Sequence, residues 1–285
     1  MKAMMLTAGL GTRLRPVTLT YAKPVVPFLG VPLASFGRAI LEQAGAKSFV
    51  LNTHYLPEQI EAYAQAMRAE GLSVETSHEP GQPLGSGGGI WKARKLLEGG
   101  GDFLVANGDE IILPHDPKVM QNFVAAHRSR RALASILVMH HPLVGSQFGG
   151  VWCDAGGAVR GFGKDRSKFG DDAIGYHYIG ILLLNDRVFE YLPAGESNIL
   201  YDALSAAIAK GEVVQAVEST FSWFETGNPK DYLSGIKETV ALLEHGKSED
   251  ARALRELTRR FRMPGTPLEH RDAARAPAPT NAELD

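Results

Sequence analysis

Short apolar runs alternate with amphipathic segments over about the first 110 residues of the chain. The runs predict strands at residues 4–8, 49–51 and 103–106, the first and last of them buried, and the alternation of Leu72, Val74 and Thr76 predicts a further strand. Apolar residues recur at helical spacing between these runs, which predicts helices at residues 33–44, 57–67 and 90–97. Strands that alternate with helices in this way are typical of an α/β fold, in which helices cover both faces of a parallel sheet.

The alternation becomes less regular after residue 110. The pattern predicts helices at residues 116–130, 201–210 and 228–245, and strands at 132–139, 151–152, 159–162, 178–184 and 213–217. From about Met263 the chain is rich in proline, alanine and charge without apolar periodicity, which predicts a disordered tail. Leucines after Ala241 would serve equally well against a partner chain or the same domain, so an oligomer is neither supported nor excluded.

The composition is that of an ordinary soluble protein, with 44% hydrophobic and 22% charged residues. A net charge of -2 gives no reason to expect a nucleic-acid partner. The single cysteine, Cys153, excludes an internal disulfide and a cysteine-based zinc site, and it fits a reducing compartment. No 18-residue apolar run and no secretory segment is present, so we expect a cytoplasmic protein without membrane contact.

The first cluster with chemical potential follows the first expected strand, where open α/β sheets place their ligands. Gly9 and Gly11 would let a phosphate approach backbone N–H groups, while Arg13 and Lys23 supply positive charge. The loop lacks the Gly-Lys-Ser/Thr of a Walker A motif, and Leu14 stands where a dinucleotide fingerprint has its third glycine. The cluster therefore predicts a phosphate site of another type.

A second cluster runs from Glu79 to Ile90 and is dominated by glycine. Gly85, Gly87 and Gly88 belong to a stretch in which four of five residues are glycines, immediately before the expected helix. Such a stretch leaves main-chain groups uncovered for a flat ligand such as a nucleobase. A flexible linker is the alternative, but an amphipathic helix follows at once, which disfavours it.

The third cluster is Asn107-Gly108-Asp109, at the end of the strand expected at 103–106. A carboxylate at the carboxyl end of a buried parallel strand points into the ligand crevice, and Mg²⁺ prefers one or two carboxylates together with phosphate oxygens. The alternative is an Asx turn that holds no metal. Beside the other two clusters, Asp109 is the better candidate for a magnesium ligand.

Together these motifs resemble the nucleoside-diphosphate-sugar pyrophosphorylases, or sugar-1-phosphate nucleotidyltransferases, over about residues 1–240. The resemblance rests on Gly-x-Gly-Thr-Arg-Leu-x-Pro at 9–16, Lys23-Pro24, Asn107-Gly108-Asp109 and the segment 223–229. It implies a Rossmann-like three-layer α/β fold, similar to glycosyltransferase A, with a mixed and mostly parallel central sheet. The catalytic domain would span residues 1–245, and a helical extension with the tail would follow at 246–285.

The resemblance also implies roles for individual residues. Arg13 would hold the β- and γ-phosphates, Lys23 would bind near the α-phosphate, and Asp109 would bind Mg²⁺ with Glu225, where the family usually has aspartate. The implied nucleotide-binding residues are Ala8, Gly9, Gly11, Thr12, Glu79, Gly85, Gly87 and Gly88. The implied sugar-phosphate residues are Gly150, Lys164 and Gly180, although Gly163-Lys164-Asp165 stands where the family has Glu-Lys-Pro.

The run at residues 84–90 most resembles N-acetylmuramate-1-phosphate uridylyltransferases and the related mannose-1-phosphate guanylyltransferase-like proteins. We therefore expect a cell-wall precursor enzyme that uses UTP and N-acetylmuramate 1-phosphate. GTP with mannose 1-phosphate, or UTP or dTTP with glucose 1-phosphate, are the rivals within the class. A nucleotide-sensing regulatory subunit is the alternative from another class, whereas a dehydrogenase is disfavoured because no acidic residue follows the second strand.

Overall fold

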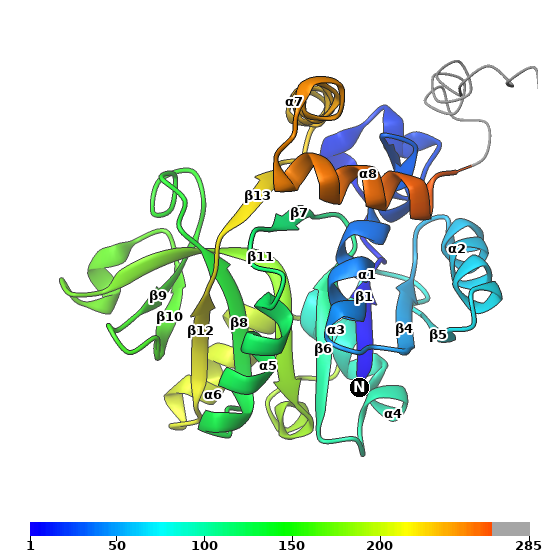
Figure 1. Cartoon of the computed structure of the whole chain (residues 1–285). Coiled ribbons are helices and arrows are strands. Elements are labelled where there is room, and N and C mark those ends of the chain that lie inside the picture. Colours follow the sequence, from blue (N-terminus) through cyan, green and yellow to red (C-terminus); the bar gives the residue numbers. More distant parts are fainter. Residues whose placement is uncertain (264–285) are drawn as a thin grey trace, which may run out of the picture.

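A computed structural model describes residues 1–263, and the tail expected from about Met263 lies almost wholly outside the described residues. Figure 1 shows a large twisted sheet with helices α1 and α5 crossing its front face. The strands of the main sheet are β1 (Lys2–Leu6), β4 (Ser48–Thr53), β5 (Ser73–His78), β6 (Asp102–Asn107), β8 (Ala134–Met139), β9 (Gly150–Cys153), β10 (Val159–Gly163), β11 (Ile174–Asn185) and β12 (Val214–Glu218). The helices are α1 (Ala34–Gln43), α2 (Pro57–Ala69), α3 (Gly85–Lys92), α4 (Arg94–Leu97), α5 (Val119–Arg130), α6 (Ser205–Ala209), α7 (Pro229–His245) and α8 (Glu249–Phe261).

The main sheet is mixed, and its parallel part carries the amino-terminal half of the chain. Its order is β10-β9-β11-β6-β1-β4-β5, with β8 pairing both β11 and β12. Strands β6, β1, β4 and β5 run parallel, whereas β11 is antiparallel to β6, β8 and β9. The carboxyl ends of four parallel strands therefore meet at one edge of the sheet, which is where such folds bind ligands.

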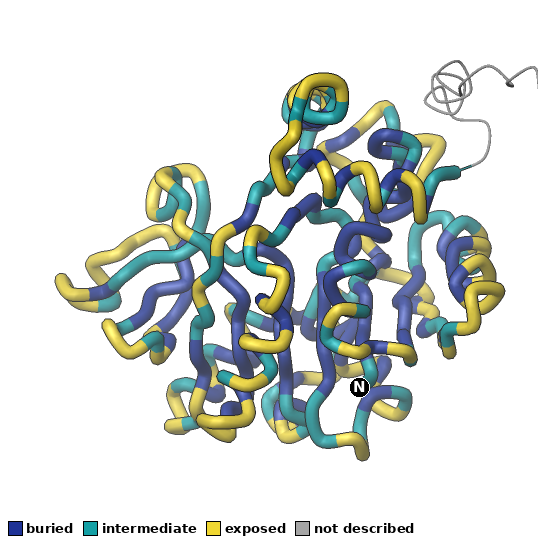
Figure 2. Tube along the Cα trace, viewed as in Figure 1, coloured by how far each residue is buried: buried dark blue, intermediate teal, exposed yellow. Residues whose placement is uncertain are grey.

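Each parallel strand contributes side chains to two separate cores, because successive side chains point to opposite faces of a sheet. In β1, Ala3 and Met5 pack with α1, α2 and α5, whereas Met4 packs on the other face with α3 and α4. Strands β4 and β6 alternate in the same way. Figure 2 shows this buried interior, with most exposed residues on the outer helix faces, the loops and the edge strands. Both faces of the sheet are thus covered by helices, as the sequence predicted.

A third, smaller core connects the carboxyl-terminal helices to the rest of the molecule. It lies beneath α7 and α8 and is bordered by two short two-stranded sheets, β2 (Pro27–Phe28) with β3 (Val31–Pro32) and β7 (Ile111–Pro114) with β13 (Phe221–Phe224). Leu254 and Phe261 of α8 are buried there against the amino-terminal domain. The apolar face of α8 thus packs on its own chain.

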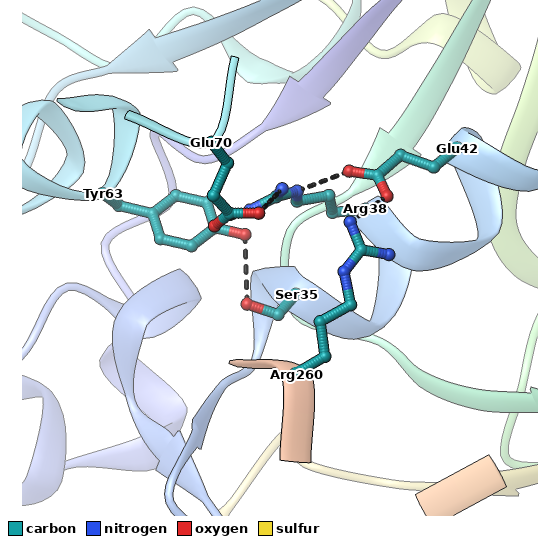
Figure 3. A network of polar contacts seen from close by, with 6 residues as sticks. All are labelled: Ser35, Arg38, Glu42, Tyr63, Glu70 and Arg260. Carbon is teal, nitrogen blue, oxygen red and sulfur yellow. Dashed lines mark hydrogen bonds and ion pairs between the residues drawn. The ribbon is translucent and has the colours of Figure 1, made fainter. Parts of the chain in front are cut away.

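A buried ion network joins α1, α2 and α8 (Figure 3). Arg38, only 1% exposed, donates from Nε to Glu42 Oε1 over 2.7 Å and pairs through both terminal nitrogens with Glu70, just after α2. Glu42 in turn accepts a hydrogen bond of 2.5 Å from Arg260 of α8. Burial alone would lower the pKa of Arg38, but the hydrogen bonds to Glu70 and Glu42 and the nearby Tyr63 hold that pKa above its usual value.

Between residues 1 and 263, none of the helices combines the length and apolar character needed to span a lipid bilayer.

Candidate active site

The carboxyl ends of β1, β4, β5 and β6 surround a cavity of about 280 Å³. It is lined by Leu6, Ala8, Gly9, Lys23, Pro24, Asn52, Glu79, Pro83, Gly85, Ser86, Asn107 and Asp109. The three sequence clusters, separated by up to about 100 residues, therefore contribute to a single hollow. Pro83 and Ser86, which lie within the 79–90 cluster, also line the cavity although neither was among the predicted nucleotide-binding residues.

An ion pair between Lys23 and Asp109 stands at the centre of this lining. Lys23 begins the 3₁₀-helix η3 (Lys23–Val25), and Asp109 follows β6. The Nζ and Oδ2 atoms are 2.6 Å apart, with side chains 11% and 34% exposed. A cation and a carboxylate are thus held side by side at the cavity wall, each able to meet an incoming charged ligand.

Glu79 forms part of the wall through its own hydrogen bonds. The side chain is 1% exposed; Oε1 accepts from Asn52 Nδ2 over 2.7 Å, and Oε2 accepts from the Leu84 N–H over 3.0 Å. Asn52 also accepts from the Thr7 N–H over 2.6 Å. This chain of bonds ties β1, β4 and the segment after β5 together, so Glu79 shapes the cavity with both oxygens already engaged.

The glycine run lies inside a helix, and the expected helix start at Ile90 was wrong. Helix α3 begins at Gly85, which lines the cavity, while Gly87 and Gly88 are buried in its first turns. The Gly87 N–H donates to the carbonyl of Ser197 over 2.8 Å. The expectation of uncovered main chain is therefore wrong for Gly87 and Gly88, whose missing side chains let residues 195–199 pack directly on the helix.

Replacing Gly88 with alanine should destabilise the protein, because a Cβ there would overlap the carbonyl oxygen of Gly195. We expect a loss of about 3 kcal/mol, the upper range for forcing extra atoms into a packed core, although alanine is the better helix former. Chemical denaturation would measure it. Gly100→Ala is the matched control, because nothing lies within 4 Å of its Cβ position. Equal stability of the two variants would show that the 195–199 segment yields easily.

The glycine-containing loop after β1 combines an open glycine with a constrained one. Nothing lies within 4 Å of a Cβ position at Gly9, which faces the cavity. Gly11 has φ 61° and its carbonyl accepts from Thr18 Oγ1 over 2.7 Å, so it shapes the turn. Thr12 and Arg13 are exposed at the start of the 3₁₀ turn η1 (Thr12–Leu14), whose last residue is buried.

A second carboxylate-bearing segment reaches the site from β13. Thr226 Oγ1 donates to the main-chain oxygen of Asp109 over 2.8 Å, and Glu225 Oε1 accepts from the Gly227 N–H over 2.6 Å. Arg13 Nη1 lies 3.4 Å from the Cβ position of Gly227, so the Arg13 loop, Glu225 and Asp109 meet at one rim of the site. These are the residues that the motifs predicted to meet.

Glu110 is a half-buried carboxyl group that none of the sequence motifs indicated. Its Oε2 accepts from Trp223 Nε1 over 2.9 Å, and its Oε1 accepts a longer bond of 3.4 Å from Asn107 Nδ2. Burial raises the pKa of Glu110 to about 7, the charge of Asp109 acts in the same direction, and the hydrogen bonds from Trp223 and Asn107 oppose both. The only hint in the sequence is a charged residue directly before the apolar run 111–113.

The residues expected on the sugar side do not all lie together. Gly180, with φ 85° in a bulge of β11, approaches the Asp109 loop: its Cβ position is 2.7 Å from Glu110 Cγ. Lys164 is exposed and lines a separate hollow of about 750 Å³ with Trp152. Gly150 is buried against Trp152 beside that hollow. Gly180 therefore lies next to Asn107 at the first cavity, Lys164 lines the second hollow, and Gly150 is packed behind the lining residues Trp152 and Val144 of that hollow.

Comparison with known proteins gives consistent matches. A family model described as nucleotidyl transferase matches residues 2–241. The chain is 31% identical over 250 residues to a UTP–glucose-1-phosphate uridylyltransferase of Synechocystis, covering 83% of this chain and 63% of that protein. It is 31% identical over 240 residues to the mannose-1-phosphate guanylyltransferase catalytic subunit beta of Drosophila pseudoobscura pseudoobscura, covering 82% and 61%. The chain thus spans less than two thirds of the length of these relatives.

Solved structures match the fold. A UTP-bound UGPase from Acinetobacter baumannii superposes with a TM-score of 0.71 at 22% identity, covering 90% of this chain and 97% of that one. HddC from Yersinia pseudotuberculosis gives a TM-score of 0.66 at 22% identity, covering 83% and 98%. The Rossmann-like α/β fold expected from the motifs is therefore confirmed.

Proposed function

Because the chain belongs to the nucleotidyl transferase family, as its motifs predicted, we propose that it transfers a nucleotidyl group from a nucleoside triphosphate to a sugar 1-phosphate and releases pyrophosphate. The observation that carries the proposal is the cavity in which Lys23 and Asp109 face the open backbone of Gly9. Cations, a carboxylate and free backbone at the carboxyl ends of parallel strands suit a triphosphate.

The donor set also fits a divalent cation that arrives with the nucleotide. Asp109 and Glu225 supply two carboxylates on segments joined by the Thr226 hydrogen bond. Among residues 1–263 no cluster of three or more His, Cys, Asp or Glu side chains forms a self-sufficient metal centre. Mg²⁺ is commonly held by one or two carboxylates with substrate phosphates, so Asp109 and Glu225 would hold it here. The bound ion would neutralise charge on the phosphates.

The proposed reaction brings together two anions, the nucleoside triphosphate and the sugar 1-phosphate. The protein must therefore supply positive charge. An oxygen of the sugar 1-phosphate attacks the α-phosphorus, the bond from that phosphorus to the bridging oxygen breaks, and the electron pair leaves with pyrophosphate. Two like charges 4 Å apart repel by about 4 kcal/mol at an effective dielectric near 20. Lys23 and Arg13 offset this repulsion and the charge that develops on the leaving group, so positive charge matters more than a general base.

A matrix of substrates tests the proposal. Purified protein with Mg²⁺ would be offered UTP, GTP and dTTP against glucose 1-phosphate, mannose 1-phosphate and N-acetylmuramate 1-phosphate, with pyrophosphate release as the readout. We expect one pair to react well above the rest. Nucleotide binding without pyrophosphate release from any pair would instead support the regulatory-subunit alternative.

We propose UTP with N-acetylmuramate 1-phosphate as the narrower pairing, on the strength of the motif at residues 84–90. The names of the two relatives give glucose 1-phosphate and mannose 1-phosphate as their substrates. Substrate pairs with these two sugar phosphates are therefore the main alternatives. Faster release with either rival would overturn the narrower proposal and leave the reaction class intact.

Shortening Glu225 tests its metal role. Glu225→Asp restores the residue usual in the family, so we expect at least a tenth of the activity and a changed ratio of Mg²⁺- to Mn²⁺-supported rates. Glu225→Ala should lose about 100-fold, in the range for a lost stabilising group. Pyrophosphate release in each metal measures both variants. An alanine variant with the activity of the unmodified protein would remove Glu225 from the ligand set.

A further inference from the structure

Asp109 and Glu225, the candidate metal ligands, lie on two segments that a pair of hydrogen bonds joins at one end of the β7–β13 sheet. Strands β7 and β13 pair from Phe221 with Pro114 to Phe224 with Ile111, and the pairing ends there. From within β13, Trp223 Nε1 donates to Glu110 Oε2 over 2.9 Å, and beyond the strand Thr226 Oγ1 donates to the Asp109 main-chain oxygen over 2.8 Å. Asp109 and Glu225 are the residues adjacent to these two bonds.

Residues from three different parts of the fold surround the side chain of Glu110. Trp223 comes from β13, Asn107 from the end of β6, and Gly180 from the bulge of β11. A side chain at Gly180 would press on both Glu110 and Asn107, with Cβ distances of 2.7 and 3.1 Å. Withdrawing a carboxyl group even partly from water has a free-energy cost, so contacts from three elements around Glu110 point to a task that an apolar side chain would not perform.

The indole of Trp223, which donates to Glu110, is itself held by contacts with other aromatic rings. Its ring packs edge-on against His177, with centroids 4.7 Å apart, and against Phe148 and His141 at 5.7 and 5.6 Å. Trp223 therefore has little freedom to follow Glu110 if the 107–110 loop moves. The hydrogen bond between Trp223 and Glu110 therefore fixes the distance between β13 and the 107–110 loop.

We propose that the Glu110–Trp223 pair is a positioning device that sets the separation of the Asp109 and Glu225 carboxylates and thereby the affinity of the site for a divalent cation. The inference rests on the proposed function, since it concerns the same two carboxylates. It matters more here because Glu225 is one methylene longer than aspartate, and its carboxylate is already oriented by the Gly227 N–H. Residues that orient metal ligands typically change metal affinity by about 10–100-fold when removed.

Metal-dependent nucleotide binding tests the pair without relying on catalysis. The dissociation constant of UTP, and in parallel of GTP, would be measured by calorimetry in EDTA and in Mn²⁺, with the ratio giving the contribution of the metal. Trp223→Phe keeps an aromatic ring but loses the N–H donor. For this variant we expect the dissociation constant in EDTA to change less than about twofold, and the ratio of the EDTA to the Mn²⁺ dissociation constant to fall about tenfold. Glu110→Ala should behave alike, and Glu110→Gln, which keeps an acceptor oxygen, should recover most of the loss.

Trp91→Phe is the matched control, because Trp91 is a partly exposed indole on α3. It should leave both dissociation constants unchanged. If Trp223→Phe and Glu110→Ala lower the melting temperature yet keep the full Mn²⁺ contribution, the pair is only structural and the inference is wrong. The absence of any Mn²⁺ contribution in the unmodified protein would also overturn it. Mn²⁺-tightened binding without pyrophosphate release would contradict the proposed function alone.

Discussion

Asp109→Asn should abolish most of the pyrophosphate release while the protein stays folded. The substitution removes the charge from the carboxylate that faces both Lys23 and the candidate cation position. We expect a fall of about 10³-fold in kcat, equivalent to about 4 kcal/mol of transition-state stabilisation. The measurement is the initial rate with the best substrate pair at saturating concentrations.

The fold should tolerate this change because the structural bond of residue 109 uses its main-chain oxygen, which accepts from Thr226. The side chain is 34% exposed, so an isosteric amide leaves no buried void. Asp172→Asn is a suitable control, since that carboxylate is 72% exposed and only pairs with Arg160 on the surface. Turnover of Asp109→Asn near that of the control would remove Asp109 from the reaction.

Among substitutions that remove a charge from the ion network of Figure 3, Arg38→Ala should lower the folding stability of the protein the most. The variant loses the bonds to Glu42 and Glu70 and the contact with the Phe261 ring, whose centroid is 4.9 Å from Arg38 Cζ. Removing one partner of a buried ion pair costs about 3–5 kcal/mol, and Glu70 at 44% exposure places this case near 3. For a chain of this size that corresponds to a fall of about 6 °C in melting temperature.

Arg260→Ala provides the comparison within the same network. Arg260 is 44% exposed and pairs with Glu42 at the rim, so its loss should cost less than about 1 kcal/mol. Thermal and chemical unfolding of both variants would measure the difference. Equal stabilities would show that Arg38 contributes no more than a surface charge, and that α8 is held by its apolar contacts alone.

The parallel half of the fold was predictable because its strands are buried on both faces. Residues 49–51 and 103–106 are continuous apolar runs, and the helices between strands show the apolar stripe that packs on a sheet. The residues that meet at Lys23 and Asp109 were also predictable, since the carboxyl ends of parallel strands converge.

Other features depend on contacts between distant segments. Strands β7 and β13 contain four residues each and are separated by more than 100 positions, so neither was expected. The glycine run was interpreted as a loop because glycine disfavours helices, whereas packing against residues 195–199 makes it the start of α3. The hydrogen bond between Glu110 and Trp223 has no local signature at all.

The direct backbone packing between α3 and residues 195–199 has a consequence for attempts to redesign the protein. Libraries that diversify Gly87 or Gly88 to change base preference would return mostly unfolded clones, because the Ser197 hydroxyl and the 198–199 backbone face Gly87 and the Gly195 carbonyl faces Gly88, which leaves no volume for a side chain. Gly85 has φ 70° and also faces Ser197, so it offers no easier entry. Productive libraries would vary residues 195–199 together with α3, or leave both untouched and start from Pro83, which lines the cavity just before α3 begins.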